Sequence, residues 1–169
     1  MESRPKIKLF LSGRDKASEL ICKTILICMW GFTFFAFFGL PATIPTHFNA
    51  MGQADSYGNK MTLFILPAIA TIIYFGLTQL VKYPHVLNYM SKITEENARE
   101  QYTMATRLLR LMKLFILIIF TGIVLFTYLT SKGVTDGLGF WFLPLTIGLI
   151  LIPTIIALSQ LLKKKNKPP

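Results

Sequence analysis

Four long apolar stretches, separated by polar and mostly basic segments, constrain the fold of this chain more than any other feature. They run over about 20–40, 61–81, 114–130 and 138–162. A bilayer core of about 30 Å is crossed by roughly 20 helical residues, and in lipid the backbone polar groups must be satisfied within the segment. The sequence therefore predicts an all-α membrane protein with four transmembrane helices.

The rest of the chain is too short for a separate soluble domain. The 169 residues leave only loops and tails once the four spans are assigned. We expect four parts: a basic cytoplasmic arm over 1–19, a three-span core over 20–130, an outward loop with the fourth span over 131–162, and a basic tail over 163–169.

The third helix is expected to begin well before its apolar part. Thr94 is a good N-cap residue, and Glu95 and Glu96 follow it, where the helix dipole favours acidic side chains. Apolar side chains then recur at helical spacing up to the third span. The third helix is thus predicted to extend into the cytoplasm. Pro67 is expected to kink the second span, and Pro144 and Pro153 to bend the fourth.

Basic residues predict the orientation of the chain in the membrane. The formal net charge is +10. If Lys23 at the start of the first span is counted with the N-terminal arm, only Lys60 and Lys132 among the eighteen Lys and Arg lie outside that arm, the middle loop and the C-terminal tail. If four helices alternate, these three segments share one side, which the positive-inside rule identifies as the cytoplasm. We expect a multi-pass protein of the bacterial cytoplasmic (inner) membrane with both termini inside.

The same distribution argues against nucleic-acid binding. Basic residues at helix ends are attracted to the anionic inner leaflet, so the lipid bilayer accounts for the charge. Single-strand binding would require a basic surface with interleaved aromatic side chains, and the aromatic residues lie mostly within the spans. The bilayer is the expected partner, and nucleic acid is not.

The segment between the first two spans, 41–60, is more specific than membrane packing requires. Pro41 and Pro45 favour an extended chain, and Gly52 permits a turn. Two interpretations remain open. Either the segment folds as a tight cap over the helix ends, with Asp55 capping a turn or pairing with Lys60, or it recognises an extracytoplasmic peptide or toxin. The candidate binding residues are Thr46, His47, Asn49, Asp55 and Lys60.

A second polar segment lies directly after the second span. Pro84 is expected to end that helix, and Thr94 to begin the next. The segment is interpreted either as a helix boundary or as a docking surface for a cytoplasmic regulator. The candidate docking residues are His85, Asn88, Glu96, Asn97 and Tyr102.

Both segments carry a resemblance to a known family. The first is similar to the signature of a bacterial membrane domain of unknown function that forms the N-terminal part of sporulation-delaying-toxin immunity proteins. The second resembles the segment that comes after this domain in many stand-alone members. The resemblance implies a role in immunity to a toxin and covers roughly 39–102. It rests on Leu40, Pro41, Ile44, Pro45, Thr46, His47, Phe48, Asn49, Gly52, Asp55, Lys60 and Pro67, and on the stretch from Tyr83-Pro84-His85 to Tyr102.

The chain lacks the residue patterns of common catalytic sites. His47 and His85 are expected on opposite membrane faces, about 30 Å apart, and neither an HExxH nor a GxSxG motif is present. None of the eight acidic residues lies inside an expected span, although ion-coupled transport normally requires such groups. We expect no catalytic residue, no metal site and no cofactor, and therefore no enzyme.

The expected function is a non-enzymatic, immunity-like or sensing role that uses the outward loop. The alternative is a small permease or ion-handling component of the membrane. That alternative predicts a water-filled cavity between the helices, lined by Thr33, Thr71, Gln79, Thr121 or Thr127.

Overall fold

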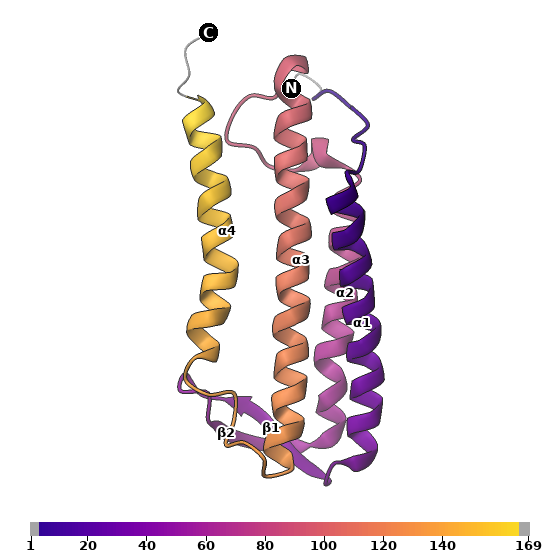
Figure 1. Cartoon of the computed structure of the whole chain (residues 1–169), viewed down its shortest axis with the longest axis vertical. Helices are drawn as coiled ribbons and strands as arrows, with labels where there is room; N and C mark the ends of the chain where they lie inside the picture. The colour runs from indigo at the N-terminus through magenta and orange to yellow at the C-terminus, as the bar shows by residue number, and fades with distance from the viewer. Residues whose placement is uncertain (1–3, 166–169) are drawn as a thin grey trace.

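Four long helices stand side by side in the computed structural model, which describes residues 4–165 and the side chains of residues 4–159 (Figure 1). The described helices are α1 (Gly13–Gly39), α2 (Ile65–Leu80), α3 (Glu95–Ser131) and α4 (Phe142–Lys165). The four apolar stretches predicted from the sequence coincide largely with helical segments long and apolar enough to cross a membrane, of which the second runs over Lys60–Leu80. The protein is therefore a mostly helical, multi-pass membrane protein.

Helix α1 begins before its apolar stretch. Ser12 is the N-cap, and its Oγ accepts a hydrogen bond of 3.2 Å from the backbone N–H of Asp15. The carboxylate of Asp15 in turn accepts from the Ser12 N–H at 2.8 Å. This capping box satisfies N–H groups that a helix start leaves without partners. The helix consequently starts at Gly13 rather than near residue 20.

Two of the prolines expected to bend the spans occupy different places in their helices. A short 3₁₀ helix, η1 (Lys60–Phe64), precedes α2, so that Pro67 lies in the first turn of α2. The expected kink at Pro67 stays a prediction. Pro153 does lie inside α4.

The prediction that Thr94 begins the third helix is confirmed. Thr94 is the N-cap of α3, and its backbone N–H donates to Asn97 Oδ1 at 3.0 Å. The helix then continues for 37 residues, well beyond the roughly 20 that a membrane requires. Its N-terminal part thus extends past the apolar stretch, as the sequence predicted.

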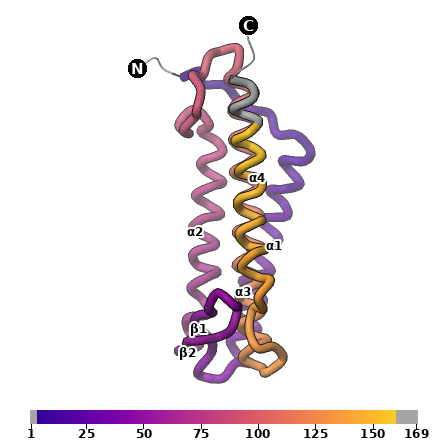
Figure 2. The backbone as a smooth tube through the Cα atoms, turned by 90° about the vertical axis from the view of Figure 1, so that its left-hand side faces the viewer, coloured from indigo at the N-terminus to yellow at the C-terminus, as the bar shows by residue number. Residues whose placement is uncertain are grey.

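The all-α prediction is wrong for the segment between α1 and α2. Here β1 (Thr43–Phe48) and β2 (Ala54–Asn59) pair as an antiparallel hairpin, with Ile44 opposite Gly58 and a register shift between Pro45 and His47 (Figures 1 and 2). Pro45 cannot donate a ladder hydrogen bond, and such residues are tolerated at edges and irregular positions of a sheet.

Helices α1, α2 and α3 form the core, and α4 lies outside it. One buried face of α1 contributes Cys22, Leu26 and Met29 to the apolar core, and Ile44 of β1 closes that core at the hairpin. Helix α4 packs against α3 on its other side (Figure 1). Most large apolar side chains of α4 are exposed, and in a membrane they contact lipid.

Helix α4 begins later than its apolar stretch, at Phe142 instead of residue 138. The preceding segment contains Gly133, Gly137 and Gly139, all with positive φ, which interrupts helical geometry. Of the predicted basic tail, α4 reaches Lys165, and 166–169 lie outside the described residues.

Candidate functional site

The hairpin brings two of the candidate binding residues together. His47 Nδ1 on β1 lies 2.5 Å from Asp55 Oδ1 on β2. The two side chains remain 67% and 42% exposed. Asp55 therefore pairs with His47, and not with Lys60 as one interpretation of the sequence had it. The pair forms an exposed polar edge on which a ligand has direct access to both side chains.

Asn49 closes the turn between the two strands. Its Oδ1 accepts hydrogen bonds from the backbone N–H groups of Met51 and Gln53, at 2.9 and 3.0 Å. Asn side chains commonly stabilise turns in this way. The oxygen is thus engaged within the hairpin, which agrees with the interpretation of this segment as a structural cap.

Two lysines at this end of the molecule bind the C-terminus of α1. Lys60 Nζ donates to the carbonyls of Phe37 and Leu40, at 3.2 and 3.4 Å. Lys132 Nζ donates to the Gly39 carbonyl at 2.5 Å. The last carbonyls of a helix lack helical partners, and the dipole favours a cation there. These are the two lysines that lie apart from the basic segments of the sequence.

The tip of the hairpin is docked on the loop between α3 and α4. The backbone N–H of Leu138 donates to the Gly52 carbonyl at 2.7 Å, and Gln53 forms a β-bridge with Gly137. A Cβ on Gly52 would lie 2.4 Å from the Gly139 carbonyl oxygen. Only glycine allows the two backbones to approach so closely. The hairpin is therefore held by contacts at both its base and its tip.

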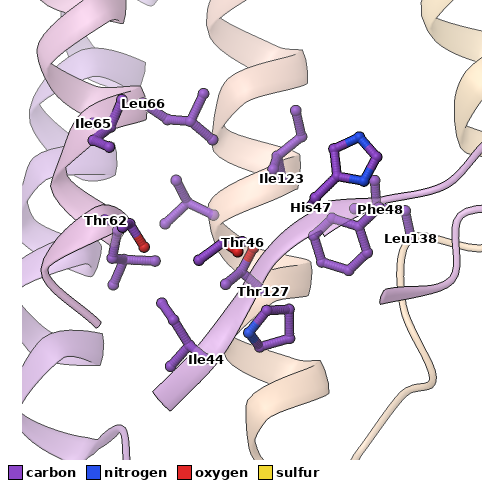
Figure 3. A pocket seen from close by; sticks show the side chains of 13 residues that line it. Ile44, Thr46, His47, Phe48, Thr62, Ile65, Leu66, Ile123, Thr127 and Leu138 are labelled. Carbon is purple, nitrogen blue, oxygen red and sulfur yellow. The ribbon is translucent and has the colours of Figure 1, made fainter. Parts of the chain in front are cut away.

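A mainly apolar cavity of about 410 Å³, here called the hairpin cavity, lies beside β1 (Figure 3). It is bounded by β1, η1, the start of α2, α3 and Leu138. Figure 3 shows Ile65 and Leu66 on α2, Ile123 on α3 and Ile44 on β1 around it. Its polar lining comes from Thr46, His47, Thr62 and Thr127. Of the candidate residues, Thr46 and His47 thus line a cavity, while Asn49 and Lys60 support the hairpin.

The candidate docking residues lie at the opposite end of the molecule, here called the basic end. It comprises the arm at 4–12, the segment at 81–94 and the first turns of α3. Tyr102 is fully buried there, and its hydroxyl donates to the Pro5 carbonyl at 3.0 Å. Asn97 Nδ2 donates to the Lys92 carbonyl at 3.0 Å. The chain's own arm and loop thus contact these two residues, whereas Asn88 and Glu96 are exposed.

The arm is fixed to the rest of the basic end by specific contacts. Arg4 Nη1 donates to the carbonyl of His85, at 3.1 Å, and to that of Leu87. Ile7 and Leu9 pack against a small second core of Ile93, Ala98 and Tyr102. Tyr89 belongs to the same cluster, and burial raises the pKa of its hydroxyl to about 12.

Sequence reasoning missed a cluster of ion pairs between α1 and α3. Glu19 accepts from Arg110 Nε at 3.1 Å and from Lys113 Nζ at 2.5 Å. Lys113 is 1% exposed and also donates to Thr78 Oγ1 on α2 at 2.9 Å. Asp15 lies 3.4 Å from Arg107. Helical spacing places the two carboxylates on one face of α1 and the three cations on one face of α3. This spacing in the sequence is the signal from which the cluster could have been predicted.

The threonines expected to line a permease channel mostly bond within their own helices. Thr33 is fully buried and donates to the Met29 carbonyl at 2.7 Å. Thr71 donates to the Pro67 carbonyl and Thr121 to the Leu117 carbonyl, each at 2.7 Å. Thr127 lines the hairpin cavity. Within the described residues, no three His, Cys, Asp or Glu side chains gather as a metal site.

Comparison with known proteins identifies a family without an assigned function. A domain of unknown function, DUF1648, matches residues 24–71, from α1 through the hairpin into α2. An uncharacterized protein of Archaeoglobus fulgidus is 33% identical over 161 residues, which cover 87% of this chain and 84% of that protein. No solved structure matches the chain. The link to toxin immunity stays a prediction from the resemblance.

Proposed function

We propose that this chain, which belongs to the same family as the uncharacterized protein of Archaeoglobus fulgidus, binds a cationic, amphipathic, membrane-active peptide without catalysing a reaction. The binding site comprises the hairpin cavity and the exposed edge of the hairpin. The protein lies in the cytoplasmic membrane with the hairpin outside, where such a peptide arrives. Sequestration of the peptide there protects the membrane or signals its presence.

The observation that carries this proposal is the pairing of a mainly apolar cavity with an exposed carboxylate at its rim. His47 lines the hairpin cavity and contacts Asp55. An amphipathic helix buries its apolar face in such a groove, and each buried methylene contributes about 0.8 kcal/mol. The cationic face of the bound peptide then lies beside the exposed edge of the hairpin.

The charges at the hairpin end favour a cationic ligand. Lys60 and Lys132 direct their ammonium groups to the carbonyls at the end of α1. The carboxylate-bearing residues Asp55 and Asp136 are exposed. These two carboxylates balance the two ammonium groups, so the hairpin end carries far less positive charge than the strongly basic chain as a whole.

The test measures peptide affinity with the protein in phosphatidylcholine nanodiscs. The probe is a fluorescein-labelled synthetic amphipathic helix of Leu and Lys residues, and empty nanodiscs give the background of lipid partition. Asp55→Asn is expected to weaken binding about tenfold, because a charge-assisted hydrogen bond contributes about 1.5–3 kcal/mol and a tenfold change in Kd is about 1.4 kcal/mol. His47→Ala is expected to weaken it as well.

The matched control is His85→Ala, which removes the chain's other histidine from the basic end. Its affinity for the probe is expected to equal that of the unaltered protein. Binding no stronger than to empty nanodiscs would contradict the proposal, as would equal affinities for Asp55→Asn, His47→Ala and His85→Ala.

A further inference from the structure

A second cavity of about 410 Å³, here called the arm cavity, lies at the basic end. It is bounded by the N-terminal arm, α1, the end of α2 with the residues that follow it, and α3. One part of its lining is polar or charged and consists of Lys8, Glu19, Thr78, Lys82 and Arg110. The other part is apolar and is formed by side chains of the arm, of which Leu9 is one, together with Val81 and Pro84. The cavity is therefore suited to an amphiphilic ligand.

The charged lining of the arm cavity has a surplus of cations. Its one carboxylate, Glu19, is already bonded to Arg110 at 3.1 Å and to Lys113 at 2.5 Å. Lys8 and Lys82 also line the cavity, and within residues 4–159 neither of their ammonium groups forms an ion pair. An anion bound in this cavity would lie close to two ammonium groups, those of Lys8 and Lys82, that no carboxylate pairs with in this part of the chain.

The arm that carries Lys8 is fixed to its neighbours before any ligand binds. Tyr102 donates to the Pro5 carbonyl, and Arg4 donates to the carbonyl of His85. Leu9 packs into the second core. Lys8 thus faces the cavity from one side and Lys82, which lies just after the last turn of α2, from another. A site whose parts are positioned in advance loses less entropy on binding.

The depth of the cavity matches a lipid headgroup. Thr78 lies in the last turn of α2, and Val81 is its C-cap, so the cavity lies where the apolar span meets the basic segment. Basic pockets between transmembrane helices on the cytoplasmic side are typical sites for anionic headgroups. The apolar part of the lining is then available to the upper part of an acyl chain.

We propose that the arm cavity binds the phosphate of an anionic phospholipid, with Lys8 and Lys82 as its counter-charges and Arg110 as a buried third cation. The phosphate bridges the N-terminal arm to α2 and so tightens the basic end. A free phosphate ion offers the same charge chemistry but leaves the apolar lining uncovered, and the experiment separates the two sources.

The experiment measures the thermal unfolding midpoint of the full chain in dodecyl maltoside. It compares added dioleoylphosphatidylglycerol, dioleoylphosphatidylcholine and inorganic phosphate. Phosphatidylglycerol is expected to raise the Tm of the unaltered protein by about 4 °C or more, as ligand binding to the folded state requires. The other two additives are expected to change it by less than about 1 °C.

Two double variants with the same charge change decide where the lipid binds. Lys8→Gln/Lys82→Gln removes the two cavity lysines and is expected to lose the phosphatidylglycerol shift. Lys6→Gln/Lys16→Gln removes two exposed lysines of the same region that do not line the cavity, and the shift is expected to remain. Equal shifts in both variants would overturn the proposal. A phosphate shift as large as that of phosphatidylglycerol would overturn the lipid assignment.

Discussion

Replacing Glu19 with alanine is expected to destabilise the folded protein by about 3 kcal/mol, because the change leaves a buried ammonium without its carboxylate. Lys113 is 1% exposed, and its Nζ lies between Glu19 of α1 and Thr78 of α2. The Tyr74 ring, 4.9 Å from this nitrogen, offers only a weaker interaction. The free energy of unfolding, measured in mixed micelles of dodecyl maltoside and SDS, checks the result.

A double variant separates the lost ion pair from lost packing. Glu19→Ala/Lys113→Met removes both charges, and a buried ion pair is often replaced by apolar side chains at little cost. Arg110 keeps Asp15, 3.7 Å away, as a partner. The double variant is therefore expected to be more stable than Glu19→Ala. A Glu19→Ala protein within about 0.5 kcal/mol of the unaltered one, the usual range for surface substitutions, would contradict this account of the cluster.

Gly52→Ala is expected to cost about 3 kcal/mol and to separate the hairpin tip from the loop between α3 and α4. The φ of Gly52 is +76°, which strains any residue with a Cβ by about 1–2 kcal/mol. The added methyl would also lie 2.4 Å from the Gly139 carbonyl oxygen, and overpacking of this kind costs typically 1–3 kcal/mol more. The hydrogen bond from the Leu138 N–H to Gly52 is expected to break.

The matched control for this substitution is Gly133→Ala. Gly133 has a similar φ of +71°, but nothing lies within 4 Å of an added Cβ. It therefore reports the backbone strain alone, and we expect about 1–2 kcal/mol. Hydrogen–deuterium exchange at the Leu138 amide is expected to accelerate in Gly52→Ala and to stay unchanged in Gly133→Ala. Equal unfolding free energies and equal exchange in both variants would show that the close backbone contact does not exist.

The helices could be predicted from the sequence because each depends on local signals. Four apolar stretches match the thickness of a bilayer, and Thr94 with Glu95 marks the start of α3 as predicted. The early start of α1 depends on an equally local signal, the Ser12–Asp15 capping box. That signal was overlooked because it precedes the apolar stretch.

The hairpin could not be predicted in the same way. Its strands lack a clear alternation of apolar and polar residues, which is the usual signal for a strand. Its tip is held by Gly137, far away in the sequence, through backbone contacts that no local pattern reveals. The ion pairs of Glu19 with Arg110 and Lys113 likewise depend on which faces of α1 and α3 meet.

The polar character of the hairpin segment could be predicted from the sequence, but the arrangement of its side chains could not. His47 and Asp55 were both selected, but their mutual contact was not foreseen. Asn49 and Lys60 were selected for the same polar character, and the structure engages them in closing the turn and capping α1. Polar residues in a loop signal hydrogen bonding, whereas only the fold decides whether the partner is the protein itself or a ligand.

The peptide-binding proposal depends on an orientation in which the hairpin lies outside the cell and the basic end lies inside. Cysteine labelling tests this orientation most directly. In a background that carries Cys22→Ala and Cys28→Ala, Ser56→Cys places a thiol on the hairpin and Asn88→Cys places one at the basic end. A membrane-impermeant maleimide is expected to label Ser56→Cys in intact cells, and Asn88→Cys only after lysis. Labelling of Asn88→Cys in intact cells, with Ser56→Cys protected until lysis, would contradict this orientation.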